Sequence, residues 1–87
     1  MRYQTLFVSE FLSPTHHSAV VVDCETGLFY NALFGEDHVG GYAYSQMAQT
    51  GKPISIEKVR ELARSEKAVH AEKFRDITEE NWREIIR

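Results

Sequence analysis

Hydrophobic and polar positions divide the chain into two unlike parts. Residues 1–51 contain eight of the ten aromatic side chains but only six charged ones, whereas residues 52–87 contain seventeen charged side chains. The first part has the β-branched and aromatic composition typical of strands, and the second has the spacing of amphipathic helices. The pattern predicts an α+β fold in a single domain over residues 1–87, because the chain is too short for two domains.

Three apolar runs in the first part predict a sheet within residues 1–35. The runs cover residues 2–12, 18–24 and 28–34. Ser13-Pro14 breaks the chain after the first run, and Gly27 can take the positive φ that closes a tight hairpin between the other two. Because elements that follow one another in sequence tend to be neighbours in space, we expect a three-stranded antiparallel meander.

The predicted strands are apolar on both faces. In the first strand, one face carries Tyr3, Phe7 and Phe11, and the other carries Leu6, Val8 and Leu12. A sheet with one face in water alternates between apolar and polar side chains instead. Both faces therefore need cover, and we expect the helices of the second part to cover only one of them.

Residues 36–51 form a glycine-rich segment in which a short helix is predicted at about 41–50, and Gly51 and Pro53 end it. Ser55 is the expected N-cap of the next helix. Residues 56–77 project one apolar stripe with His70 at its centre, although Glu66 and Lys73 also fall within the stripe. One helix over 56–77 with a local exit from the core is favoured over two helices.

A last helix is predicted after Thr78, with Trp82, Ile85 and Ile86 at helical spacing and acidic residues in its first turn. The charged amphipathic helices of residues 52–87 then number two or three. We expect them to pack on one face of the sheet.

Charge and cysteine content narrow the class of protein. The net charge of −3 divides into −4 over residues 1–51 and +1 over residues 52–87. Neither part is basic enough to attract a phosphate backbone. A single cysteine suits a reducing compartment, and no run approaches the length of a signal peptide core or a membrane span. We therefore expect a cytoplasmic protein without a membrane partner.

A metal or hydrolytic site is one alternative. The residues available for it are His16, His17, Cys24 and His38. They lack the paired spacing of a zinc site, and Asp23 and Glu25 beside Cys24 disfavour a reactive thiolate. The sequence therefore predicts no enzyme activity and no cofactor.

A nucleic-acid-associated transcriptional regulator that uses the helical half is the second alternative. Its bases would be Arg60, Arg64, Lys67 and Arg75. Acidic residues are interleaved with these bases, which indicates a solvated helix face and weighs against a nucleic-acid partner.

The favoured hypothesis is a small non-enzymatic module that binds another protein, as an inhibitor or regulator, and that also forms a homodimer. An uncovered apolar sheet face and the acidic and tyrosine-containing segment 36–44 would make the contact. By analogy, stand-alone domains of this size include bacterial and phage regulators. The predicted partner-binding residues are Phe7, Phe11, Phe34, Glu36, Asp37, His38, Tyr42 and Tyr44.

Overall fold

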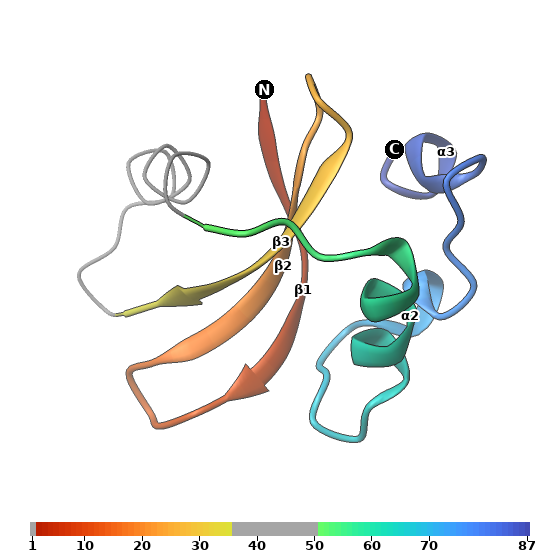
Figure 1. The fold of residues 1–87 in the computed structure, drawn as a ribbon. Helices are drawn as coiled ribbons and strands as arrows, with labels where there is room; N and C mark the ends of the chain where they lie inside the picture. The colour runs from red at the N-terminus through yellow and green to blue at the C-terminus, as the bar shows by residue number, and fades with distance from the viewer. Residues whose placement is uncertain (1, 36–50) are drawn as a thin grey trace.

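The structure, a computed structural model, describes residues 2–35 and 51–87. Its sheet has three strands in the order β1-β2-β3, with β1 at Tyr3–Phe11, β2 at His17–Asp23 and β3 at Leu28–Phe34. Both pairings are antiparallel (Figure 1). The prediction of an α+β fold with a three-stranded meander is confirmed, because short turns join strands that are adjacent in sequence.

Two irregularities in β1 decide which face its side chains occupy. Tyr3 pairs with Asp23, Phe7 with Val20 and Phe11 with His17, and the register shifts between Thr5 and Phe7 and again between Val8 and Glu10. Each shift inserts a residue and reverses the alternation of side chains. Phe7 therefore lies on the opposite face from Tyr3 and Phe11, and the prediction that these three share a face is wrong.

The main core joins one face of the sheet to the helical half. From the sheet it takes Phe7, Val20, Val22 and Phe29. From the second half it takes Ile56, Val59, Ala63, Ala71, Phe74, Ile77 and Trp82. The Phe7 and Phe74 rings are stacked with centroids 5.4 Å apart, and the Trp82 ring meets Phe29 edge-on at 5.5 Å.

The other face of the sheet is buried as well. Tyr3, Ala19, Val21 and Phe34 form a second apolar cluster, and Val21 is fully inaccessible. The expectation that a broad apolar face lacks cover is therefore wrong for these residues. Both faces of β2 are inside the protein, which accounts for its unbroken apolar run.

The long helix predicted over residues 56–77 ends much earlier. Helix α2 covers Ile56–Arg64, and the Ser55 hydroxyl accepts a hydrogen bond from the Lys58 N–H, which confirms the predicted N-cap. Ser65 leaves the helical conformation, and its hydroxyl accepts from the Lys67 N–H. The prediction of one helix is wrong because a straight continuation would carry Glu66 into the core.

His70 lies outside any helix. Its backbone has a φ of 57°, in the left-handed region, and its side chain is exposed, so its predicted place at the centre of an apolar stripe is wrong. Next to this turn, Val69 pairs with Val8 on the β1 edge of the sheet. A short 3₁₀ helix, η1, follows at Glu72–Phe74.

The last helix, α3, is one turn at Trp82–Ile85. Thr78 and Asn81 hydrogen-bond reciprocally just before it. The Thr78 N–H donates to the Asn81 side chain at 2.7 Å, and the Asn81 N–H donates to the Thr78 hydroxyl at 3.1 Å. Thr78 thus caps the turn that leads into α3, which then places Trp82 in the core. The short helix predicted at 41–50 lies outside the described residues.

Both edges of the sheet are held at one point by another part of the chain. The Val69 N–H donates to the Val8 carbonyl at 2.9 Å on the β1 edge, and the Ile54 N–H donates to the Phe29 carbonyl at 2.7 Å on the β3 edge. Among the described residues, no further strand pairs with β3 beyond Phe29.

Candidate protein-binding surface and neighbouring groove

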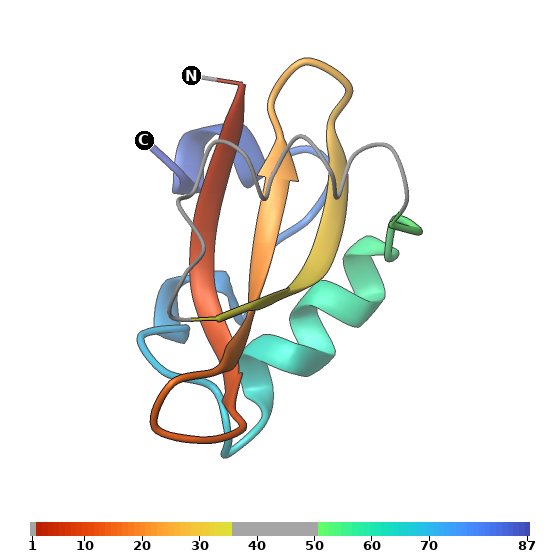
Figure 2. The ribbon, with the colours of Figure 1, turned by 90° about the vertical axis from the view of Figure 1, so that its left-hand side faces the viewer.

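One end of the sheet carries exposed apolar side chains. Phe11 is 59% exposed, Leu12 54% and Leu33 57%. Because β1 and β3 run in the same direction on either side of β2, their C-terminal ends lie at the same end of the sheet, where the β1–β2 turn also lies (Figure 2). We call Phe11, Leu12 and Leu33 the sheet-end surface, which wraps around the end of the sheet because Phe11 pairs with His17 on one face and Leu33 with Ser18 on the other.

A row of three rings crosses the strands at this end. The His17 ring stacks on Phe34 with centroids 5.6 Å apart, and the Phe11 ring lies 5.8 Å from His17 on the other side. Phe34 is buried, His17 is half-buried and Phe11 is exposed. The row anchors Phe11 to the sheet, so that part of its ring is fixed while the rest faces solvent.

The structure divides the predicted partner-binding residues into three groups. Phe11 is available at the surface, and Phe34 is buried on the other side of the His17 ring. Phe7 is 3% exposed and packs in the main core, so it is not available for a partner. The remaining five predicted residues lie outside the described part of the chain, namely Glu36, Asp37, His38, Tyr42 and Tyr44.

The residues of the metal or hydrolytic alternative are far apart where the structure describes them. His17 begins β2, and Cys24 directly follows its end. A strand of this length spans roughly 20 Å, so His16 and His17 cannot share a small site with Cys24. Cys24 is half-buried against the main core. Within residues 2–35 and 51–87, no three histidine, cysteine or acidic side chains are grouped as metal ligands.

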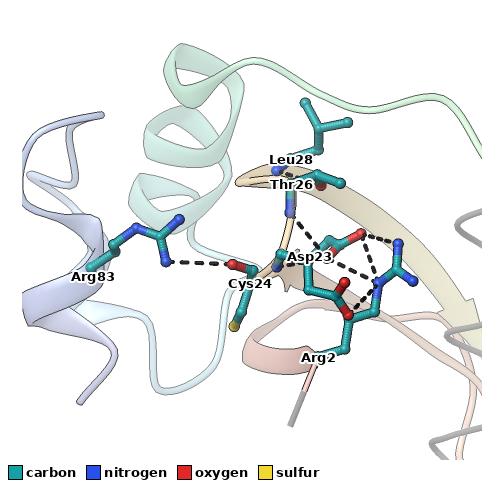
Figure 3. Close-up of polar contacts among 7 residues, drawn as sticks. Arg2, Asp23, Cys24, Thr26, Leu28 and Arg83 are labelled. Atoms are coloured by element: carbon teal, nitrogen blue, oxygen red, sulfur yellow. Dashed lines mark hydrogen bonds and ion pairs between the residues drawn. The ribbon is translucent and has the colours of Figure 1, made fainter.

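Asp23 is the centre of a polar network at the other end of β2 (Figure 3). Its carboxylate accepts hydrogen bonds from the Arg2 guanidinium and from the backbone N–H groups of Glu25 and Thr26. Burial raises the pKa of Asp23, but these donors outweigh it, so the pKa of this carboxyl lies below its ordinary value. The network fixes the β2–β3 turn, in which Gly27 has the predicted positive φ, here 75°.

A groove of about 480 Å³ lies beside this turn. Its apolar walls include Leu28 and Phe29 from β3, Ile54 from the chain before α2, and Trp82 from α3, and two carboxylates, those of Glu57 and Glu79, also line it. Leu28 is 43% exposed at its margin. The groove can therefore hold a ligand that is partly apolar and that carries either no charge or a positive charge next to the two acidic residues.

The two arginines of α2 have structural partners. The Arg60 guanidinium donates to the Ile77 carbonyl at 2.9 Å, and the Arg64 guanidinium donates to the Arg75 carbonyl at 3.0 Å and to Asp76 at 3.2 Å. These bonds tie α2 to the segment after η1. Lys67 also pairs with the Glu10 carboxylate at 3.4 Å, so three of the four bases that the nucleic-acid alternative requires have partners within the fold.

Sequence reasoning missed the groove and the exposure of Leu33. The groove is built by three segments that are far apart in sequence, and no local pattern marks them as neighbours. Leu33 belongs to an apolar strand whose three aromatic members are buried. Only the position of the strand end, beyond the reach of the main core, leaves its side chain in solvent.

The described residues thus define a small α+β domain with an apolar sheet end and an acidic, apolar-walled groove. No family model, curated protein or solved structure matches the chain. In the described part of the chain, no helix is long and apolar enough to cross a membrane.

Proposed function

We propose that this chain is a small non-enzymatic protein-binding module that acts as an inhibitor or regulator of a partner protein in the cytoplasm. The sheet-end surface makes the contact, together with the segment 36–44 that follows Gly35. The observation that carries the proposal is the placement of three large apolar side chains, each more than half exposed, at one end of the sheet.

The energetic argument rests on burial of these side chains. Complete burial of a leucine or phenylalanine contributes about 1.5–3 kcal/mol. Side chains that are already partly covered, such as Phe11, Leu12 and Leu33, contribute on the order of 1 kcal/mol each on that scale. Three such residues give a useful anchor but not a complete interface, which is why segment 36–44, with its tyrosines and acids, belongs to the proposal.

Self-association uses the same end of the protein. Phe11, Leu12 and Leu33 are each more than half exposed there, so this end offers apolar area that a second copy can bury. Packing of two such sheet ends about a two-fold axis would bury the Leu33 side chains of both copies. The proposed homodimer and the heterologous complex then compete for one surface.

The experiment compares Leu33→Asp with Leu28→Asp, which makes the same change at the opposite end of β3. Light scattering at micromolar concentration measures the oligomeric state, and affinity capture from the native host identifies a partner. We expect Leu33→Asp to give a folded monomer that loses the partner, while Leu28→Asp, which is far from the sheet-end surface, keeps the homodimer. An oligomeric state and a partner that are both unaffected by Leu33→Asp would refute the proposal.

A further inference from the structure

The groove beside the β2–β3 turn has the dimensions of a binding site. Its volume of about 480 Å³ is within the range of ligand pockets, which is roughly 300–1,000 Å³. It is open to solvent, and Leu28 stands partly exposed at its margin. Phe29, Ile54 and Trp82 supply apolar walls that are held by the core and by the Ile54–Phe29 backbone hydrogen bond. The groove therefore suits one or two apolar side chains of an extended segment.

The charges of the groove favour a cationic neighbour. Glu57 and Glu79 line it, and none of its described lining residues is basic. Glu79 forms no ion pair with the described residues, and Glu57 meets the Arg60 guanidinium only at 4.0 Å, with a side chain 73% exposed. The Ser55 cap and Glu57 itself already complement the positive end of α2, so the helix adds little attraction for an anion.

Trp82 adds a donor. The residue is 6% exposed, and its indole N–H makes no hydrogen bond with the described part of the chain. No fully buried side-chain nitrogen or oxygen of the described residues lacks a partner, so this N–H is not completely buried. The Arg83 guanidinium stacks on the ring at 4.2 Å but does not line the groove. The indole N–H is therefore free to donate to a carbonyl of a ligand.

We propose that this groove binds a short extended protein segment in which an apolar side chain adjoins a lysine or arginine. The apolar side chain enters between Leu28 and Trp82, and the base meets the carboxylate of Glu79. The site uses none of the residues of the sheet-end surface, so it is a second contact that stands independently of the first.

The test uses the fact that Trp82 is the single tryptophan of the chain, so its fluorescence reports directly on the groove. The probes are short capped peptides without aromatic residues, in which a leucine adjoins a lysine, a leucine adjoins a glutamate, or an alanine adjoins a lysine. We expect the leucine–lysine peptide to shift the Trp82 emission saturably. The other two peptides should bind at least about tenfold more weakly, because each lacks either the apolar or the charged contact.

Matched variants locate the binding. Glu79→Gln should weaken the leucine–lysine peptide by about two- to fivefold, as expected for one exposed ion pair, and should reduce the loss of affinity on adding salt. Glu80→Gln removes the same charge one residue away, outside the groove lining, and should have no effect. Leu33→Asp should also leave the affinity unchanged.

Three results would overturn the inference. One is an emission that does not respond to the leucine–lysine peptide at millimolar concentration. Another is equal binding of the leucine–glutamate peptide, which would indicate a groove that selects only apolar groups. The third is an equal effect of Glu80→Gln and Glu79→Gln, which would indicate a general attraction between the peptide and an acidic surface.

Discussion

Arg2 and Asp23 are 21 residues apart in sequence, and the Arg2 Nη2 lies 3.1 Å from the Asp23 Oδ2. Arg2 precedes β1 and Asp23 ends β2, so this ion pair joins these two strands at the end of the sheet opposite the β1–β2 turn. The Asp23 side chain is 2% exposed and the Arg2 side chain 47%. A buried carboxylate is thus neutralised by a base that still reaches solvent, which limits the cost of burying the charge.

We expect the stability of the protein to depend on the ionisation of Asp23. Because its pKa is lower in the folded chain than in the unfolded chain, this carboxylate stabilises the fold above its unfolded-state pKa of about 4. That contribution is lost as the pH falls through the folded-state pKa. Urea unfolding followed by circular dichroism should show a free energy of unfolding that decreases below about pH 5.

The variant Asp23→Asn isolates this contribution from those of other acids. It should unfold more easily at neutral pH, by about 1–3 kcal/mol, and its stability should depend less on pH. Glu25→Gln, at a side chain that is 65% exposed and also pairs with Arg2, serves as the control and should retain the pH dependence of the parent chain. If the free energy of unfolding depends equally on pH in the parent chain and in Asp23→Asn, the ionisation of Asp23 does not stabilise the fold.

Phe7 and Phe11 should respond differently to the same substitution. Phe7→Ala removes a ring packed against Phe74 in the main core and should lower the free energy of unfolding by about 3–5 kcal/mol. Phe11→Ala removes a ring that is mostly in solvent and should change it by less than about 1 kcal/mol. Urea denaturation of the two variants measures both values, and similar losses would contradict the opposite placement of these rings by the irregularities of β1.

Gly27 should resist substitution because of its backbone. Its φ of 75° is costly for any residue with a Cβ, while the added methyl of Gly27→Ala would only touch Trp82 at 3.6 Å. We expect a loss of about 1–2 kcal/mol from the backbone alone. Gly35→Ala is the comparison, since its Cβ would meet the exposed His16 ring at 3.0 Å and that ring can move. Thermal unfolding should rank Gly27→Ala as the less stable variant. The reverse order would contradict the backbone strain expected at residue 27.

Local signals predicted the strands and the start of α2. The apolar runs and Gly27 mark the hairpin, and Ser55 marks the helix, because turn and cap chemistry act over three or four residues. The end of α2 had no comparable signal. Ser65 ends the helix, where a glycine or proline would have been a recognisable signal. The direction of the chain after Ser65 is explained by its contacts with the sheet, such as the pairing of Val69 with Val8.

The candidate sites were harder to predict than the elements. Phe11 was expected to be a contact and is exposed, whereas Phe7 has the same residue type and a similar sequence environment and is in the core. The difference arises from register shifts, which depend on pairing with β2 and leave no mark on a single strand. The acidic groove depends on Glu57 and Glu79 lining one cavity, and their separation in sequence hides that relationship.

Short-range sterics and hydrophobic periodicity, which can be read along the chain, fix the class of the fold, the three strands, the tight hairpin and the start of α2. The tertiary structure alone decided which aromatic rings are buried, where α2 stops, how Asp23 is neutralised and which acids share a groove. These features depend on contacts between distant residues, whose energies exist only after the strands and helices have packed together.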